Sequence, residues 1–343
     1  MSNESAPKAT QPIKKQFHEE VADRLVEQIK AGTAPWQKPW EPGEEALPHN
    51  ASTGNRYKGF NAIWLMAQGR EDSRWMTYKQ AQEVGAQVRA GEKGTTIQYW
   101  KFDDTRAKKD DQGKIIKDRE GQTVYETVRL DRPRSFTSTV FNAEQIDGLS
   151  PRAVKAQEWD SLKRADGILE ATGAKILHQS GDNAYYSPVQ DVIVLPERYQ
   201  FKERSGYYAT ALHEVGHWTG HSSRLDRDLS HPFGSDGYAK EELRAEIASM
   251  ILGMDVGVGH DPSRHAAYVG SWIKAIRDDP TVLQRASSDA EKIVTFIKDL
   301  EQKRNQSIEV AQGQTAAMKA SLQVISKNHE HSMAQSGDRE LTI

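Results

Sequence analysis

The chain has 343 residues, which is long enough for two domains that each bury a core of their own. With 36% hydrophobic and 28% charged residues its composition is that of a soluble protein, and no apolar run approaches the length of a membrane span. The absence of cysteine excludes disulfides and thiolate metal sites, and the N-terminus lacks the apolar core of a secretion signal. We therefore expect a cytoplasmic protein with no membrane partner.

Charge gives no global sign of a nucleic-acid partner. The net charge is -3, and residues 1–149 carry 23 Lys and Arg against 22 Asp and Glu. A surface that binds nucleic acid must therefore be a local patch rather than a field of the whole molecule.

Helices dominate the predicted beginning of the chain. Residues 1–12 are polar, and we expect them to be disordered. Apolar residues then recur at every fourth position: Phe17, Val21, Leu25 and Ile29. This spacing predicts an amphipathic helix that ends at Gly32. Two further helices are predicted at 61–68 and 78–89, the second closed by Gly91.

Strands follow these helices. Aromatic and β-branched residues are enriched in three stretches: 95–102, 124–130 and 135–141. The charged segment 103–121 between the first two is predicted to be a long exposed hairpin loop. A turn-rich stretch at 141–151 is the expected junction between two domains.

The second half is predicted to contain both helices and short strands. A helix is expected at 153–171, followed by strands at 175–178, 184–187 and 192–195. Two central helices follow: the first carries His213 and His217, and the second carries Glu242 and Glu246. Two more helices are expected at 263–277 and 281–302. The fold class is therefore α+β, with domains at 13–149 and 150–305 and a polar, flexible tail or frayed helix at 306–343.

The most informative motif lies on the first central helix. His213 and His217 are four residues apart, so both imidazoles lie on one helix face and can reach one metal ion. Glu214 sits beside them, where it can accept a proton from a water at that metal. The flanking apolar residues suit a buried helix. The alternative is an ordinary core helix that happens to carry two histidines.

The sequence offers more than one candidate for a third ligand. Ser223 occupies the position where a HExxHxxGxxH site has its third histidine, and His221 is out of register. On the next predicted helix Glu242 and Glu246 share one face. Two histidines and one carboxylate are a usual ligand set of hydrolytic zinc sites. We prefer Glu246 as the ligand, with Glu242 orienting a histidine, and the alternative is a solvated acidic face.

If this site forms, Zn²⁺ is the expected ion, with another divalent metal as the alternative. Glu214 is then the predicted general base. The sequence also offers several groups that could stabilise an oxyanion: Tyr185, Tyr186, His221, His260 and His265. It does not choose among them.

Aromatic residues and cations are interleaved along residues 36–101. Single-stranded DNA is bound by stacking of bases on aromatic rings while cations follow the phosphates. The predicted DNA-binding residues are Trp36, Lys38, Trp40, Tyr57, Lys58, Asn61, Trp75, Tyr78, Lys79 and Lys93. The pattern continues to Tyr99, Trp100 and Lys101. Because tryptophans usually fill cores, we expect about half of these rings to be buried.

Several stretches together resemble the ArdC-type antirestriction proteins of conjugative plasmids. They are Pro35–Trp40, Tyr57–Ala62, Trp75–Gln80, Gly91–Gly94, Val140–Gly148, His213–Gly220 with Ser223–Leu225, and Tyr238–Glu246. The resemblance covers about 15–303 and implies an N-terminal domain that binds single-stranded DNA and a C-terminal zincin-like metallopeptidase domain. It also implies a metal at His213 and His217, with Glu246 as the preferred third ligand.

Two hypotheses follow from the residues and the resemblance. In the first, the protein coats single-stranded plasmid DNA during conjugation and protects it from restriction enzymes of the host. In the second, it is an active metalloprotease that cleaves a host defence protein or a DNA-bound protein, and the N-terminal domain targets it. The intact Glu214 favours the second, because a purely structural metal site needs no general base. We prefer the first.

Overall fold

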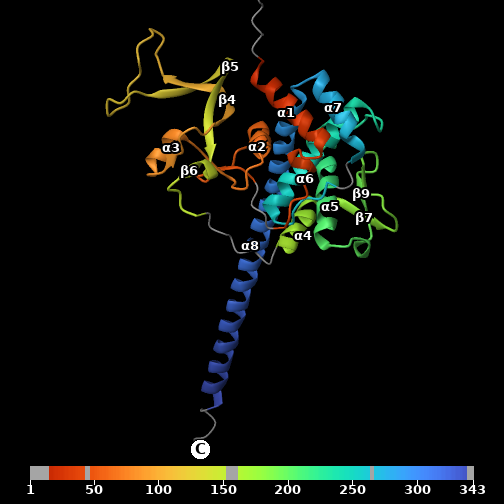
Figure 1. The fold of residues 1–343 in the computed structure, drawn as a ribbon. Coiled ribbons are helices and arrows are strands. Elements are labelled where there is room, and N and C mark those ends of the chain that lie inside the picture. Colours follow the sequence, from red (N-terminus) through yellow and green to blue (C-terminus); the bar gives the residue numbers. More distant parts are fainter. Residues whose placement is uncertain (1–14, 43–46, 152–160, 263–265, 338–343) are drawn as a thin grey trace, which may run out of the picture.

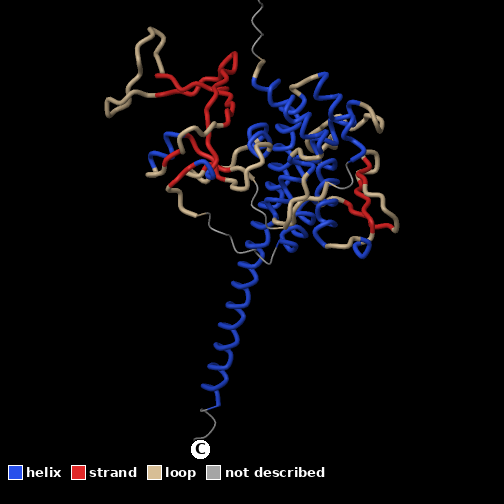
Figure 2. Tube along the Cα trace, viewed as in Figure 1, coloured by secondary structure: helices blue, strands red, loops and turns tan. Residues whose placement is uncertain are grey.

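The structure is a computed structural model that describes residues 15–42, 47–151, 161–262 and 266–337. It mixes helices and strands in two parts, in agreement with the predicted α+β class. Figures 1 and 2 show a sheet with a long hairpin beside a larger, mainly helical part. The helix α8 (Val282–Gly337) runs through the helical part and projects from it.

The N-terminal half begins with the helix that the sequence predicts. α1 (Phe17–Ala31) buries Val21, Leu25 and Ile29 along one face and ends at Gly32, which has a φ of 69°. This left-handed conformation is accessible to glycine without a steric penalty. The periodicity therefore located both the helix and its end correctly.

The larger sheet has the strand order β1-β2-β5-β4. Its strands are β1 (His49–Asn50), β2 (Arg74–Thr77), β4 (Thr95–Ala107) and β5 (Tyr125–Asn142). β1 and β2 are parallel, and the other neighbours are antiparallel. α2 (Gly59–Met66) packs against β4, and its Asn61 side chain bonds to the backbone of Gln98. The sequence did not predict β1 and β2, which are too short to show an alternating pattern.

The hairpin of β4 and β5 is longer than predicted. The two strands expected at 124–130 and 135–141 are one continuous strand, β5, and β4 extends to Ala107. The pairing register shifts between Lys101 and Asp103, which marks a bulge or irregularity in the hairpin. It lies opposite residues 131–134, where the sequence predicted a break between two strands. The segment 103–121 is therefore loop only in its second part.

The third helix predicted in this half, at 78–89, is shorter in the structure. α3 (Tyr78–Glu83) ends early, and Gly85 then takes a φ of 75°. The chain continues into β3 (Gln87–Val88), which pairs with β6 (Ile146–Asp147). The expected junction at 141–151 thus contributes a strand that pairs within the N-terminal half.

The second half contains a smaller sheet and five helices among the described residues. The strands β7 (Lys175–Gln179), β8 (Tyr185–Ser187) and β9 (Val192–Pro196) confirm the three predicted ones. They are ordered β7-β9-β8, so β8 is an edge strand. The helices are α4 (Ser161–Thr172), α5 (Arg204–Trp218), α6 (Asp236–Val256), α7 (Val269–Asp278) and α8. The first part of the helix predicted at 153–171 lies outside the described residues, as do residues 1–12.

α8 is continuous through the segment that was expected to be a polar tail. The predicted helix at 281–302 forms its first part, and the helix goes on to Gly337. Flexibility of the part beyond 306 stays a prediction. Across the ranges that the structure covers, no helix combines the length and apolarity that crossing a bilayer requires.

The largest hydrophobic core contains residues from both halves. α1 packs against α7, and α2 packs against α8. Trp36 lies in the short 3-10 helix Pro35–Gln37, is fully buried, and makes an edge-to-face contact with Trp272 at a centroid distance of 6.5 Å. Residues 17–40 therefore pack as part of the helical body, although they precede the N-terminal sheet in the chain.

This packing predicts different effects for two tryptophans. Trp36→Ala should lower the free energy of unfolding by about 3–5 kcal/mol, because it leaves a large cavity in the core. Trp100→Ala, at a ring that is 52% exposed, should change it by less than about 0.5 kcal/mol. Urea denaturation of both variants measures this difference, and equal losses would contradict the assignment of Trp36 to the core.

Candidate metal centre

α5 carries the histidine pair into the interior of the second half. Most of this helix is buried, and His213 and His217 are one turn apart with their Nε2 atoms 3.1 Å from each other. Glu214 is also buried, and it lines the same cavity as the two histidines. The sequence prediction of one helix face with converging imidazoles is thus matched by the geometry.

α6 packs against α5 and supplies the carboxylates. The helices approach closely because Gly216 has no side chain: a Cβ there would lie 3.4 Å from Ala245. α6 begins at Ser235, whose hydroxyl accepts a hydrogen bond from the Tyr238 N–H, and ends at Gly257. Glu241, Glu242 and Glu246 are all buried on this helix.

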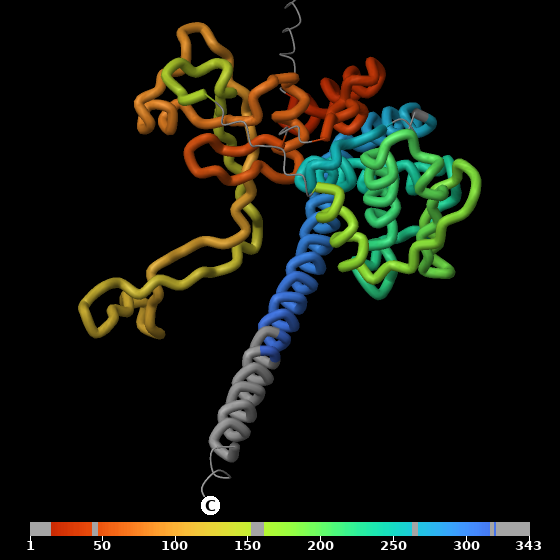
Figure 3. The backbone as a smooth tube through the Cα atoms, turned by 90° about the horizontal axis from the view of Figure 1, so that it is seen from below, coloured from red at the N-terminus to blue at the C-terminus, as the bar shows by residue number. Residues whose placement is uncertain are grey.

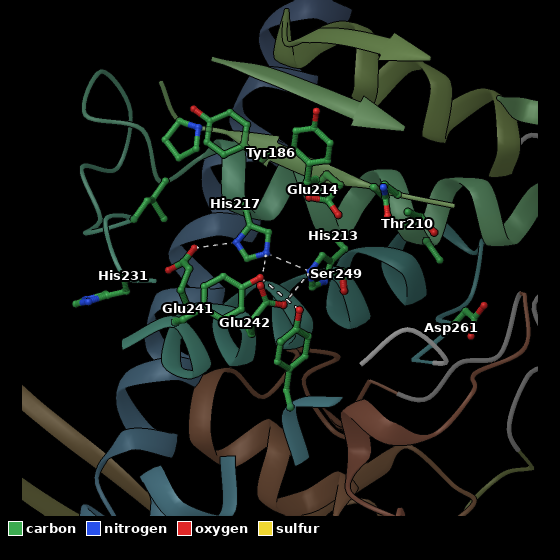
Figure 4. A pocket seen from close by; sticks show the side chains of 18 of the residues that line it. Tyr186, Thr210, His213, Glu214, His217, His231, Glu241, Glu242, Ser249 and Asp261 are labelled. Atoms are coloured by element: carbon green, nitrogen blue, oxygen red, sulfur yellow. Dashed lines mark hydrogen bonds and ion pairs between the residues drawn. The ribbon is translucent and has the colours of Figure 1, made fainter. Parts of the chain in front are cut away.

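Glu242 is the carboxylate that faces both histidine nitrogens. Its oxygens lie 3.5 Å from His213 Nε2 and 3.4 Å from His217 Nε2. These three side chains form a group whose ligand atoms all lie within 4.8 Å of one another (Figure 4). The sequence preference for Glu246 as third ligand does not agree with this arrangement.

Glu246 instead contacts the other nitrogen of His213, at 3.1 Å from Nδ1. Both glutamates share one face of α6, as predicted, but they are one turn apart. Only the position of α6 relative to α5 decides which of them reaches the Nε2 atoms. The geometry therefore makes Glu242 the better candidate for the third ligand and Glu246 the candidate to orient His213.

Each histidine has a carboxylate on its Nδ1. His217 Nδ1 lies 3.3 Å from Glu241, and Arg227 forms a 2.7 Å ion pair with the same carboxylate. A carboxylate that accepts the Nδ1 proton leaves the Nε2 lone pair free for a metal. Both Nε2 atoms therefore face Glu242 as potential ligand atoms.

The charges in this cluster perturb one another strongly. Burial alone would lower the pKa of His217, but the negative charge of Glu242 and the bond to Glu241 raise it to about 9. The pKa of His213 is raised for the same reason, against burial, by Glu242 and Glu246. Burial would raise the pKa of Glu241, yet hydrogen bonds from His217 and Arg227 lower it to about 2. Without a metal, the glutamates beside each histidine thus favour the protonated imidazole.

A cavity of about 630 Å³ opens over this cluster. Its lining includes Glu214, Glu242 and two tyrosines that the sequence analysis missed, Tyr238 and Tyr268, whose hydroxyl oxygens are 3.3 Å apart. Burial and the nearby Glu242 charge raise the pKa of Tyr238, so its hydroxyl stays protonated and can donate a hydrogen bond. Tyr238 opens one of the stretches that carry the family resemblance, but no spacing rule linked it to the histidines, and Tyr268 lies in a separate 3-10 turn.

The predicted oxyanion donors lie in different places. Tyr185 and Tyr186 line the cavity, but the Tyr186 hydroxyl donates to Asp191 at 2.7 Å. His221 is bonded to Ser223, and His260 is buried behind Glu246. His265 lies outside the described residues.

Burial excludes part of the predicted DNA-binding set. Trp36 and Trp75 are 0% and 2% exposed, so neither ring can stack on a base. Asn61 has its amide bonded to the backbone of Gln98 and supports β4. In this structure the two rings contribute to the core and Asn61 supports a strand. The aromatic pattern alone does not separate core rings from surface rings.

The remaining members of that set lie nearer the surface. Trp40 and Tyr57 are half-buried, and Trp40 packs against the shared core. The exposed members are Lys38, Lys58, Tyr78, Lys79 and Lys93. Their binding to DNA stays a prediction.

Among the exposed aromatic residues in the described ranges, which also include Tyr78, Tyr199 and Phe233, five lie on the β4–β5 hairpin. They are Tyr99, Trp100, Phe102, Tyr125 and Phe136. The sequence analysis included only the first two in its interleaved segment. The sequence feature that could have identified the other three rings is the composition of these strands. Most of their remaining residues are polar, so few apolar neighbours can cover the rings.

Comparison with known proteins identifies both halves. Residues 15–141 match the family described as the N-terminal domain of anti-restriction factor ArdC, and residues 163–289 match the family described as zincin-like metallopeptidase. The metal-free crystal structure of the antirestriction protein ArdC from plasmid R388 has a TM-score of 0.66 and 35% identity, with 84% of this chain and 99% of that chain covered. Its Mn(II)-bound structure gives 0.62 and 34%, with 84% and 98% covered.

Curated sequence relatives match across most of this chain. The uncharacterised protein y4eC of Sinorhizobium fredii is 34% identical over 289 residues, covering 82% of this chain and 91% of y4eC. A DNA primase TraC of Escherichia coli is 64% identical over 296 residues, which are 85% of this chain but 20% of TraC. A second TraC is covered to 29%, so the chain spans less than a third of these relatives. The chain belongs to the ArdC family of antirestriction proteins, with a zincin-like second domain.

The cluster predicts a pH-dependent affinity for metal. With a pKa of about 9 His217 is protonated at pH 7 in the metal-free protein, and a metal must displace that proton. Affinity for Zn²⁺ or Mn²⁺ should therefore rise with pH by up to about tenfold per unit for each proton released, and level off above the histidine pKa values. Calorimetry in buffers of different ionisation enthalpy counts the protons. Binding without proton release would contradict the assigned pKa shifts.

Proposed function

We propose that this protein binds single-stranded DNA and protects plasmid DNA from host restriction during conjugation. The observation that carries this proposal is a group of exposed rings and cations on the β4–β5 hairpin, which projects from the body (Figures 1 and 3). We call it the hairpin patch and define it as Tyr99, Trp100, Lys101, Phe102, Arg134 and Phe136.

The hairpin patch offers ring surface on both faces of a two-stranded ribbon. Tyr99 is paired with Phe136 across the strands, and Trp100 is paired with Ser135. Because side chains alternate along a strand, Trp100 points to the face opposite Tyr99 and Phe136. About half of the Trp100 and Phe136 surface remains exposed. Such exposure has a cost in water that stacking with bases would offset.

The charges of the hairpin patch suit a polyanion. Lys101 is paired directly with Arg134, and like charges in this position destabilise a sheet. Asp104 contacts both cations and reduces this repulsion. The stretches 99–102 and 129–136 carry four Lys and Arg against one Asp, so the base of the hairpin is locally basic in an acidic protein. A phosphate backbone would relieve the repulsion between the paired cations.

The second half fits a divalent metal. His213, His217 and Glu242 would hold the ion, and the support of both Nδ1 atoms by carboxylates agrees with neutral imidazole ligands. When bound, the metal would supply Lewis acidity and lower the pKa of a coordinated water. The Mn(II)-bound ArdC structure of R388 supports a divalent ion in this family. Zn²⁺ remains our preferred ion because two histidines and one carboxylate are its usual ligands in hydrolytic sites.

A metallopeptidase activity is the second candidate function. Glu214 lines the cavity with both histidines, where it can accept a proton, and the Tyr238 hydroxyl can donate to an oxyanion. The edge strand β8 borders the same cavity through Tyr185 and Tyr186, and an extended peptide could add to its free edge. The substrate would then be a protein of the host defence or one bound to DNA.

The DNA-binding proposal predicts that single ring deletions in the hairpin patch weaken binding. Trp100→Ala and Phe136→Ala in the full chain should each raise the Kd for a fluorescent oligothymidine by about tenfold, because one stacked base contributes about 1–3 kcal/mol. Fluorescence anisotropy measures this, and transfer of a plasmid into restricting and non-restricting recipients measures protection.

Tyr199→Ala is the matched control, because Tyr199 is a more exposed ring on the second half. The charge contribution is separable: replacing both Lys101 and Arg134 by Gln should reduce the slope of log affinity against log salt by about 1.4, at about 0.7 per phosphate contact. Unchanged affinity in both ring variants would exclude the hairpin patch as the binding surface.

The peptidase candidate predicts a selective effect of Glu214→Gln. This change removes the base but keeps the size of the side chain, so cleavage of a peptide library should fall at least about a hundredfold. Metal affinity and binding to single-stranded DNA should be unchanged. Protection that persists in cells with this variant would show that cleavage is not required for antirestriction, and equal peptide cleavage by both proteins would rule out Glu214 as the base.

A further inference from the structure

We propose that the segment Pro35–Trp40 of the N-terminal half positions the metal ligand His213 through His260 and Glu246, so that metal binding and docking of this segment are coupled. The inference rests on the metal centre proposed above. It assigns a role to the Pro-Trp-Gln-Lys-Pro-Trp motif, which the hairpin patch leaves unexplained because Trp36 is buried.

The connection is a chain of short polar contacts. His213 Nδ1 lies 3.1 Å from one oxygen of Glu246, and the other oxygen lies 3.2 Å from His260 Nε2. The same His260 nitrogen lies 2.9 Å from the carbonyl oxygen of Trp36. Both neighbours of His260 Nε2 are acceptors, so this nitrogen carries a proton, which it donates to the Trp36 carbonyl, while the Glu246 oxygen lies within ion-pair distance. The chain thus runs from a backbone carbonyl of the N-terminal segment to a metal ligand.

The N-terminal segment is fixed to His260 by backbone bonds as well. The Trp40 N–H donates to the His260 carbonyl at 3.1 Å, and the His260 N–H donates to the Trp40 carbonyl at 3.0 Å. Gly259 makes this approach feasible, since a Cβ there would lie 2.3 Å from the Trp40 oxygen and its φ is 78°. His260 therefore keeps its position only while the segment is docked.

These contacts matter for stability because the groups that make them are buried. The side chains of Glu246 and His260 are 0% and 2% exposed. A buried carboxylate is unfavourable unless positive or donating groups lie beside it, and here the imidazoles of His213 and His260 lie 3.1 and 3.2 Å from its two oxygens. If the segment leaves, His260 loses its backbone partners, and Glu246 loses a fixed donor. His213 is then less firmly held with Nε2 towards Glu242.

The coupling must act in both directions. If docking of Pro35–Trp40 raises the affinity for metal, then metal must raise the stability of the docked segment by the same factor. A purely structural role of His260 would change thermal stability but would leave the affinity of the folded protein for metal unaltered. Metal affinity and local protection of the segment therefore distinguish the two roles.

The test uses the full chain with Zn²⁺ or Mn²⁺ alone. His260→Leu removes the donor, and we expect an affinity about 10–100-fold lower, measured by competition with a chromophoric chelator. His260→Gln can still donate a hydrogen bond and should recover part of the loss. His178→Leu, at an exposed histidine on β7, is the control and should bind as the wild type does.

The reciprocal measurement is hydrogen exchange at the Trp40 amide, which needs no variant. Metal should slow this exchange in the wild type, and the slowing should be lost in Glu246→Gln. The coupling is overturned if folded His260→Leu binds metal with wild-type affinity. It is also overturned if metal does not change the rate of hydrogen exchange at the Trp40 amide. A wild-type protein that binds no metal at all overturns the proposed centre as well, so the two failures are distinguishable.

Discussion

The burial of charge between α5 and α6 constrains much of the second half. Four carboxylates, Glu214, Glu241, Glu242 and Glu246, lie out of water beside two imidazoles. Such a group is stable only if every acid has a positive or donating partner. The surrounding structure supplies these partners from several directions: Arg227 binds Glu241, and His260 binds Glu246. The elements that carry these partners are thereby fixed around the cluster.

This requirement explains why the two halves are not packed as separate units. His260 lies beyond the end of α6, and it is bridged to Trp40 from the first part of the chain. α1 and Pro35–Gln37 then complete the core around α6 and α7. A boundary placed near residue 149 follows the turn-rich sequence and the two family matches, but the packing crosses it. The sheet with its hairpin projects from this shared body, and so the surface proposed for DNA is separated from the buried cluster.

The sequence predicted the parts of the site that depend on one element. A spacing of four residues places two histidines on one helix face whatever surrounds the helix, so His213, Glu214 and His217 were identified. The choice between Glu242 and Glu246 depends on the position of α6 relative to α5, which a helical period does not contain. Tyr268 and His260 reach the cluster from separate segments, and no local pattern links them to it. For the same reason the sequence could not predict the burial of Trp36, whose partner Trp272 is far along the chain.

The hairpin shows the opposite case, in which local sequence is informative but was read too narrowly. Trp36 and Trp75 are buried by apolar residues that come from other segments of the chain. Trp100 and Phe136 lie in strands whose other residues are largely polar, and about half of each ring's surface is exposed. An aromatic ring in such a strand has no core to enter, so exposure follows from the surrounding composition. Thus, in this protein, the rings in polar strands are better candidates for binding bases than the Pro-Trp motif, because the latter already has a partner in the metal-binding half.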